Sequence, residues 1–253
     1  MNANDRREQI LCYVNEKKEI HFSEIKELIP DVSEMTLRRD LEHLSRDNKL
    51  VRVLGGAKSI ESLVSTTEPA YSTRTYENAE SKAIIAQKAL QLIQPDSTIF
   101  IGSGTTASQL AKLIPNGNYF IVTTGMNCAI DLSALEDASI LMLGGIVNKN
   151  SFSVHGSITA EMLDNMSFSI AILGVSGFIP GKGFCTSVAE DYVMLQKIIA
   201  CSEKTAILMD SSKTRRNGIY TFAPLGVVDY VVSDGNLDPK IVADLEENGI
   251  TVL

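Results

Sequence analysis

A segment rich in glycine, serine and threonine, GSGTT at residues 102–106, has the residue types that bind a small anion. Glycines let backbone N–H groups approach a phosphate, and the hydroxyls of serine and threonine add further donors. Apolar Ile99–Ile101 precede the segment, and Leu110 and Leu113 follow it at helical spacing, which predicts a turn between a strand and a helix. Such a turn also needs glycine for structural reasons alone, so both interpretations stay open.

Four more glycine-rich or polar segments follow apolar runs in the same way. They are Thr123–Gly125, Gly144–Gly145, Gly174–Gly177 and Asp210–Lys213. In open α/β sheets a ligand binds beyond the carboxyl ends of the strands, so we expect these turns to converge with GSGTT on one crevice. The predicted anion-binding residues in these turns are Ser103, Gly104, Thr105, Thr106, Thr124, Gly125, Ser176 and Gly177.

Two lysines are candidates for pairing with the charge of a phosphate. Lys213 follows an apolar run and lies beside Asp210 in a polar turn, which favours a charge-assisted hydrogen bond. Lys182 lies between Gly181 and Gly183 and can cover the same site. The alternative for both is a solvated loop lysine, and for Lys182 this is the preferred interpretation.

A different chemistry is indicated by SEMTLRRDL, where Thr36, Arg38 and Arg39 point outward from a helix whose leucines point inward. In helix-turn-helix proteins the N-terminal part of the recognition helix enters the major groove of DNA. There arginine contacts guanine bidentately and threonine contacts a thymine methyl or a phosphate. The alternative is that the arginines solvate the helix surface, paired with Glu34 or Glu42.

Three short amphipathic helices are expected to position these residues. Apolar residues recur at helical spacing over residues 5–17 and again from Ser23, and Pro30 ends the second helix. Ser33 is a suitable N-cap for the third helix, which we expect to end near Asn48. The buried stripe of this third helix is predicted to be Leu37, Leu41 and Leu44.

A strand and a glycine turn at residues 50–57 follow the third helix and predict a β-wing. Three helices and a wing are the order of a winged helix-turn-helix domain, which we assign to residues 1–58. Arg52, Gly55 and Gly56 are expected to meet adjacent phosphates of the DNA. Residues 59–77 lack a periodic pattern and are predicted to be a linker between domains.

Residues 78–253 alternate between helix-compatible stretches and short apolar runs. The expected strands are Thr98–Ile101, Tyr119–Val122, Ile140–Leu143, Ile170–Val175, Ala206–Met209, Tyr230–Val232 and Ile250–Leu253. This alternation predicts an α/β domain with a mainly parallel sheet covered by helices on both faces.

Charge and composition narrow the functional classes. The net charge is −8, but residues 1–58 hold 11 basic and 11 acidic residues, so the acidic excess belongs to the second part of the chain. The four cysteines lie far apart, which excludes a CxxC zinc site or a disulfide framework, and Cys185 is the one considered as a reactive thiol, with burial expected. No apolar run approaches the length of a membrane span and no signal segment is evident, which predicts a cytoplasmic protein.

The segment from Arg6 to Ala57, above all SEMTLRRDLEHL and RVLGGA, resembles the DNA-binding domain of DeoR-type repressors. Across residues 80–253 the stretches SGTT, LGG, GVSG, GKG and DSSK resemble the sensor domain of the same family, in the same order. The resemblance implies a ribose-5-phosphate isomerase-like fold for that domain and a phosphorylated sugar as its ligand. It also supports Lys182, Gly183 and Lys213 as effector-binding residues.

The chain departs from the family pattern at four places. Leu54 replaces a histidine before the glycines of the wing, and Asn48 replaces a common glycine. Gly102 stands where an aspartate that holds a sugar hydroxyl is usual, and the helix after Glu190 has Leu195 and Gln196 where a basic residue is frequent. The resemblance therefore supports the predicted contacts to the phosphate more strongly than contacts to the hydroxyls of the sugar.

The favoured hypothesis is a repressor that binds double-stranded operator DNA, senses a phosphorylated sugar without a cofactor, and acts as a dimer or tetramer. His21, His43 and His155 form no triad and no GxSxG elbow is present, so catalysis is not expected. Two alternatives stay open: a phosphosugar isomerase with a helical appendage, and an interaction module that binds neither DNA nor sugar.

Overall fold

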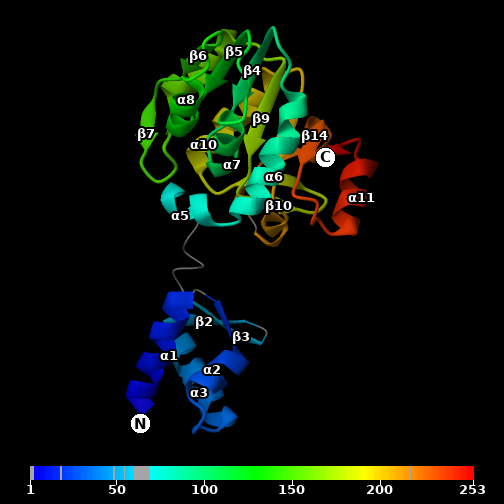
Figure 1. Cartoon of the computed structure of the whole chain (residues 1–253). Coiled ribbons are helices and arrows are strands. Elements are labelled where there is room, and N and C mark those ends of the chain that lie inside the picture. Colours follow the sequence, from blue (N-terminus) through cyan, green and yellow to red (C-terminus); the bar gives the residue numbers. More distant parts are fainter. Residues whose placement is uncertain (1–2, 18, 48, 54, 60–68, 217) are drawn as a thin grey trace. The chain divides into compact units, whose positions relative to one another are not determined.

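The chain forms two compact units, residues 1–67 and 68–253, in the computed structural model (Figure 1). The structure describes residues 3–17, 19–47, 49–53, 55–59, 69–216 and 218–253. The positions of Asn48 and Leu54, two departures from the family pattern, lie outside the described residues. Each unit is therefore treated by itself below.

The first unit is a winged helix-turn-helix, as the sequence predicts. Its elements are α1 (Ala3–Lys17), β1 (Glu19–His21), α2 (Phe22–Leu28), α3 (Glu34–Arg46), β2 (Leu50–Val53) and β3 (Gly56–Ser59). The strands form an antiparallel sheet in the order β1-β3-β2. Strand β1 was not expected from the sequence, because its three residues carry no pattern of their own and are defined by pairing with β3.

The core of this unit contains the residues that the helical spacing selected. Leu37, Leu41 and Leu44 of α3 are buried, as are Ile10 and Val14 of α1. These five side chains belong to one apolar cluster. The stripe predicted for the third helix is therefore confirmed, and its opposite face remains exposed for contact with another molecule.

The second unit is built on a seven-stranded sheet in which every pair of neighbouring strands is parallel. The strands, in the order β15-β14-β12-β9-β4-β5-β6, are β4 (Ser97–Ile101), β5 (Tyr119–Thr123), β6 (Ser139–Met142), β9 (Ile170–Gly174), β12 (Thr205–Leu208), β14 (Tyr230–Val232) and β15 (Thr251–Val252). Each of the seven expected strands is present, which confirms the α/β class with a mainly parallel sheet.

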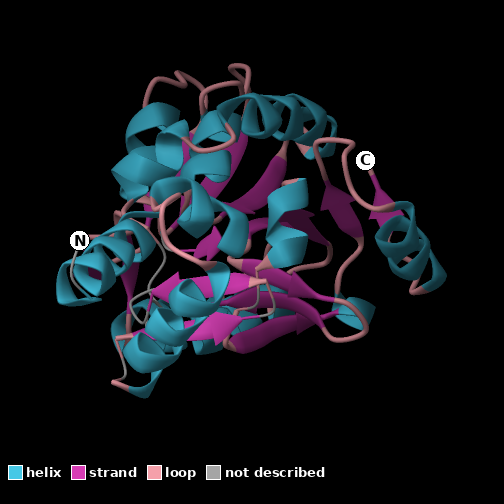
Figure 2. Cartoon of the chain, turned by 90° about the horizontal axis from the view of Figure 1, so that it is seen from below, coloured by secondary structure: helices cyan, strands magenta, loops and turns pink. Residues whose placement is uncertain are grey.

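Alternate residues of the strands contact two separate cores, as the period of two requires. Ile99 and Ile101 of β4 belong to the cluster under α6 (Ala79–Ala89), α7 (Thr105–Ala111) and α8 (Met126–Leu132). Phe100 of the same strand belongs to the cluster on the other face, with side chains of α10 (Ala189–Ala200) and α11 (Pro239–Glu247). Figure 2 distinguishes the strands from the helices around them.

The second face differs from the expectation of helices alone, because a small antiparallel sheet covers part of it. This sheet has the order β10 (Gly177–Ile179), β11 (Gly183–Thr186), β13 (Tyr220–Pro224). Its residues Phe178, Phe184 and Phe222 are fully buried in the core of that face. These strands are three to five residues long, and β11 and β13 are far apart in sequence, so no local pattern reveals them.

The remaining elements lie in turns and connections. They are α5 (Tyr71–Tyr76), η1 (Leu90–Leu92), β7 (Ile146–Asn148), β8 (Ser153–His155), α9 (Ser157–Met162), η2 (Leu163–Asn165), η3 (Ser211–Arg215) and η4 (Leu225–Val227). Helix α5 lies within residues 59–77, which the sequence predicted as linker, and it belongs to the second unit. Among the described residues no helix is long and apolar enough to span a membrane.

Candidate DNA-binding and effector-binding sites

The N-terminus of α3 is capped as the sequence predicts. The Ser33 Oγ accepts a hydrogen bond from the Thr36 N–H at 3.3 Å. The Ser33 Oγ and Thr36 Oγ1 also lie 2.9 Å apart, within hydrogen-bond distance. Both hydroxyls thus lie at the end of the helix that enters the major groove in this class of domain.

Arginines of α3 and the wing lie on the exposed surface of the first unit. Arg38 lies 4.4 Å from the centre of the Phe22 ring and 3.9 Å from a Glu34 carboxylate oxygen. Arg39 is exposed, and no ion pair or hydrogen bond joins its side chain to another described residue. Of the two outward arginines in the first half of α3, Arg39 is therefore the one whose guanidinium is available for an external partner.

Residues of the wing are held by the sheet of this unit. Arg52 pairs with Glu42 at 2.8 Å in an exposed ion pair. Gly55 adopts φ +85° in the turn before β3, and its carbonyl accepts the Phe22 N–H at 2.8 Å. A Cβ on Gly56 would lie 1.9 Å from the Ile20 carbonyl oxygen, so this glycine is required for the approach of β1 to β3. The wing glycines thus have a structural role beside the predicted DNA contact.

A buried cluster of charges fixes α3 against α1. The Asp40 carboxylate is almost fully buried and accepts hydrogen bonds from Arg6 Nε at 2.6 Å and Arg7 Nε at 2.8 Å. Burial raises the pKa of this carboxyl, but the two guanidinium hydrogen bonds outweigh burial and hold the pKa below its usual value. Asp40 thus stays ionised and orients the helix that presents Arg39.

The turns predicted to bind an anion lie at one edge of the large sheet. Because the strands are parallel, residues after β4, β5, β9 and β12 share the edge formed by the carboxyl ends of the strands. Strand order reverses between β4 and β9, since β4 leads to β5 on one side while β9 leads to β12 on the other. Ligands bind at this kind of reversal in open α/β sheets.

Ser103 lies where three of these turns meet. A Cβ on Gly125 would lie 3.1 Å from Ser103 Cα, and a Cβ on Gly174 would lie 3.7 Å from the Ser103 carbonyl oxygen. The turns after β4, β5 and β9 are therefore in direct contact. Ser103 and Gly125 lie close together, as the sequence analysis expected for residues of one crevice. Gly104 adopts φ +115°, a conformation that favours glycine and brings the chain into α7.

The neighbouring hydroxyl residues differ in exposure. Ser103 and Thr106 are half-buried, whereas Thr105 and Thr124 are buried. The Ser176 Oγ accepts the Ser187 N–H at 3.3 Å, and a Cβ on Gly177 would lie 2.0 Å from the Arg216 carbonyl oxygen. Gly177 is therefore required for packing, while Ser103 and Thr106 offer the more accessible hydroxyls of the predicted set.

The turn after β12 contacts a buried lysine that the sequence analysis did not select. The Lys82 side chain of α6 is 5% exposed and donates to the carbonyl oxygens of Arg74 and Glu77. Burial lowers the pKa of Lys82, the nearby Lys213 lowers it further, and Asp210 opposes this. Lys82 thus lies close enough to Lys213 and Asp210 for both charges to act on it.

A sequence signal for Lys82 exists. Lys82, Ile85, Ala86 and Ala89 are the buried residues of α6, at the spacing of an apolar stripe. A buried lysine in such a stripe needs hydrogen-bond acceptors for its ammonium group. Its place in the sequence therefore predicts polar groups next to the apolar face of the helix. The same region includes Asn78, whose Nδ2 donates to Asp210 Oδ1 at 3.3 Å and to Ser212 Oγ at 3.0 Å.

Lys182 and Gly183 lie in a different setting. Lys182 is exposed in the turn between β10 and β11, and Gly183 begins β11; the Gly181 N–H of the same turn donates to Asp244 of α11 at 3.4 Å. A Cβ on Gly183 would lie 2.2 Å from the Ala223 carbonyl oxygen, which makes this glycine necessary for the pairing of β11 with β13. The turn is therefore positioned by the small sheet and by α11.

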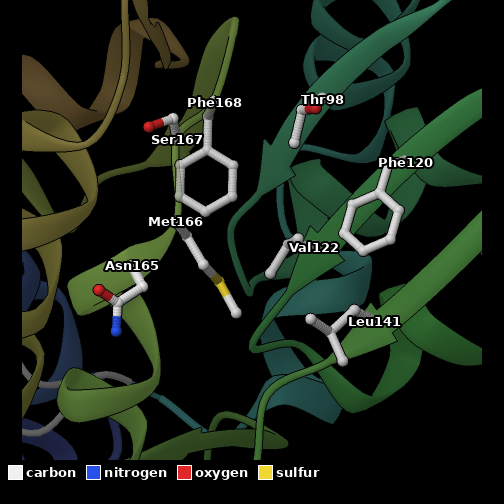
Figure 3. Close-up of a pocket in the computed structure, with 8 residues that line it drawn as sticks. All are labelled: Thr98, Phe120, Val122, Leu141, Asn165, Met166, Ser167 and Phe168. Carbon is white, nitrogen blue, oxygen red and sulfur yellow. The ribbon is translucent and has the colours of Figure 1, made fainter.

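An apolar pocket of about 280 Å³ opens on the same unit (Figure 3). Thr98 and Phe120, near the amino ends of β4 and β5, contribute to its wall, and Met166 and Phe168 precede β9. The pocket thus lies toward the amino ends of the strands, and none of the predicted effector residues lines it. Its chemistry is that of an apolar surface and does not suit a phosphate.

Two cysteines of this unit are buried. Cys185 is fully buried beside Thr221 Oγ1, at 3.5 Å, which agrees with the expectation of burial. Cys128 lies next to the GSGTT turn, with its Sγ 3.5 Å from the Gly102 carbonyl oxygen. Burial raises the pKa of the Cys128 thiol to about 12. Both thiols are enclosed by the fold, with Cys128 adjoining the candidate anion site.

Comparison with known proteins assigns a family to each unit. The model for the DeoR-like helix-turn-helix domain matches residues 6–63, and the model for the DeoR C terminal sensor domain matches residues 77–235. The uncharacterized HTH-type transcriptional regulator YulB of Bacillus subtilis is 32% identical over 98% of this chain and 95% of its own length. The lactose phosphotransferase system repressor of Staphylococcus epidermidis is 31% identical over 93% of this chain and 94% of its own length.

Among solved structures, ribose 5-phosphate isomerase A of Methanocaldococcus jannaschii aligns with a TM-score of 0.41 and 16% identity, over 55% of each chain. The two family models together match both the winged helix-turn-helix unit and most of the α/β unit. The chain therefore belongs to the DeoR family of helix-turn-helix transcriptional regulators.

Proposed function

We propose that this chain is a repressor of a sugar-metabolism operon whose DNA binding is controlled by a phosphorylated sugar. The observation that carries the proposal is the meeting of three strand-end turns at Ser103, at the same edge of the sheet as the turn that holds Lys213. The relative of Staphylococcus epidermidis, a lactose phosphotransferase system repressor, supports the link to sugar metabolism.

The DNA contact is assigned to the exposed side of α3 and to the wing. Arg39 contacts a base edge, with Arg38 and Thr36 beside it, because these residues follow the N-cap Ser33 of the recognition helix. Arg52 and the turn at Gly55 contact phosphates and set the register. One such unit contacts few base pairs, so we propose that a dimer or tetramer pairs two units on a symmetric operator.

The effector contact is assigned to the carboxyl edge of the sheet. Backbone N–H groups of the turn from Ser103 to Thr106 hydrogen-bond the phosphate, and the Lys213 ammonium pairs with its charge. Thr124 and Ser176 flank this position on the neighbouring turns. Effector binding alone shifts the protein between a state that binds DNA well and one that binds it less well, so the proposal needs no catalysis and no cofactor. A regulator that acts in this way is expected in the cytoplasm, where its operator lies.

The test is a gel shift of the DNA upstream of the chain's own gene, at stated salt, with and without a panel of phosphosugars. The panel contains ribose 5-phosphate, glucose 6-phosphate, fructose 6-phosphate and fructose 1-phosphate. We expect the chain to bind the fragment, and one or more of the panel to change its affinity at least about tenfold, a coupling in the usual range. Aldose–ketose turnover of the panel, without any shift of the DNA, would replace the proposal with a phosphosugar isomerase.

A further inference from the structure

Helix α5 is the first helix of the second unit along the chain (Figure 1). Any covalent influence of the effector-binding unit on the first unit has to pass through residues 69–78. This stretch, named here the α5 segment, packs on the second unit through several separate contacts. The elements that these contacts reach indicate the role of the segment.

The first contact joins the α5 segment to the helix that follows GSGTT. The Tyr71 O–H donates to Ser108 Oγ of α7 at 2.8 Å. Thr105 and Thr106 form the first turn of the same seven-residue helix. A displacement of the GSGTT turn therefore moves the acceptor of the Tyr71 hydroxyl.

The second contact joins the segment to the turn between β7 and β8, which is hydrogen-bonded to the start of α8. The Tyr71 ring packs edge-on against the Phe152 ring, with centroids 5.6 Å apart, and the Tyr71 N–H donates to the Asn150 carbonyl at 2.7 Å. The Phe152 carbonyl in turn accepts the Met126 N–H at 2.8 Å, directly after Gly125. Tyr71 is thus linked to two of the predicted anion-binding turns indirectly, through Ser108 of α7 and through Phe152.

The third contact joins the segment to the turn after β12. Asn78, at φ +50°, donates from its amide to Asp210 and Ser212, which precede Lys213. The buried Lys82 ammonium holds the carbonyls of Arg74 and Glu77 at the C-terminal end of α5, where a cation is favourable. The segment is therefore fixed at both ends by the elements that form the candidate effector site.

We infer that the α5 segment carries the occupancy of the effector site toward the N-terminal end of the second unit, with Tyr71, Asn78 and Lys82 as positioning residues. An anion bound at the strand-end turns holds the turn of Asp210 and Ser212, which accept from Asn78, so the segment becomes more tightly fixed when the site is filled. This inference rests on the proposed function, since it needs an anion at the strand-end turns.

The test measures amide hydrogen exchange in the full chain, with millimolar inorganic phosphate against chloride at equal ionic strength. We expect exchange within residues 71–82 to slow at least about fivefold on addition of phosphate, the size of one net hydrogen bond. Asn78→Gly preserves the left-handed backbone and removes the amide contacts, and Tyr71→Phe removes only the hydroxyl. Both variants are expected to lose most of the slowing at residues 71–78 and to retain it at residues 103–106.

Tyr76→Phe is the matched control, because Tyr76 is on the same helix and 84% exposed. It should behave as the unsubstituted chain. Slowing at residues 103–106 that never extends to residues 71–78, or full slowing in both Asn78→Gly and Tyr71→Phe, would overturn the role of the α5 segment and leave the proposed function standing. Absence of slowing at both places would overturn the anion site itself, and with it the inference.

Discussion

The two units present their candidate binding groups in opposite ways. In the first unit, long side chains of α3 extend from a helix whose other face is buried, and Arg39 reaches outward without a described partner. In the second unit, the candidate groups come mainly from backbone turns after parallel strands, three of which meet at Ser103. A helix face is specified by local spacing, whereas a set of turns is specified by the topology of the whole sheet.

Their buried charges differ as well. Asp40 is balanced inside its own unit by Arg6 and Arg7. Lys82 is held by carbonyl oxygens, and the charges of both Lys213 and Asp210 act on it. The charge of Asp40 thus serves the structure of the first unit, while the charges around Lys82 adjoin one of the predicted anion-binding turns. The following predictions test this contrast, beginning with the largest effect.

Replacing Asp40 should destabilise the first unit strongly. Asp40→Asn leaves two largely buried guanidinium groups without their counter-charge, so we expect a loss of about 3 kcal/mol in the free energy of unfolding of that unit. The measurement is denaturant unfolding followed by circular dichroism. Glu42→Gln, which opens the exposed pair with Arg52, is the control and should cost less than about 1 kcal/mol. Equal effects of the two substitutions would refute the structural role of Asp40.

Replacing Arg39 should affect DNA binding and leave stability unchanged. Because the Arg39 side chain is exposed, Arg39→Ala is expected to weaken binding to the upstream fragment by about 2 kcal/mol, or about thirtyfold. Arg46→Ala is the control on the same helix, since Arg46 is exposed in its last turn. Gel-shift titration and thermal unfolding measure the two properties. Unaltered affinity in Arg39→Ala would remove Arg39 from the DNA-reading surface.

Replacing Gly125 should disturb the meeting of the turns. The added methyl of Gly125→Ala would lie 3.1 Å from Ser103 Cα and 3.2 Å from Cys128 Sγ, so the turns must separate by a few tenths of an ångström. We expect a cost of about 1 kcal/mol in stability and about a fivefold weaker binding of inorganic phosphate in calorimetry. Gly226→Ala, where a Cβ meets nothing within 4 Å, is the control. Phosphate binding of unchanged strength would separate Gly125 from the anion site.

Acid should weaken the first unit through Asp40. Since the folded pKa of Asp40 is lowered, its ion pairs contribute stability above the unfolded pKa of about 3.8, and this contribution is lost as the pH falls through the folded value. The slope from one such group is at most about 1.4 kcal/mol per pH unit. Unfolding curves of the unsubstituted chain and of Asp40→Asn, measured from pH 6 downward, should converge at low pH. Parallel curves would contradict the lowered pKa.

The sequence predicted those features that depend on local patterns. Leu37, Leu41 and Leu44 gave the buried stripe of α3, and Ser33 gave its N-cap. The seven apolar runs gave the strands of the parallel sheet, because strands buried on both faces are continuously apolar. Their order across the sheet, by contrast, follows from packing between residues far apart in the chain.

Features defined by distant partners were missed or placed differently. Strands β10, β11 and β13 are short, and their glycines 177 and 183 are selected by contacts with the backbone at Arg216 and Ala223. Helix α5 has six residues and no apolar stripe, so its position depends on Tyr71 and on the carbonyl contacts of Lys82. The side chains that connect the candidate effector site to the rest of the fold therefore emerge only from the three-dimensional structure.

The enclosed thiol of Cys128 also determines how the candidate anion site responds to its surroundings. With a pKa of about 12, this sulfur remains protonated at neutral pH, and the thiolate that reacts with peroxides, alkylating agents or soft metals is scarcely populated. Cys12, which is exposed on α1, offers a more accessible target for such reagents. Oxidants and alkylating agents are therefore expected to modify Cys12 of the first unit before they modify Cys128 beside the candidate anion site.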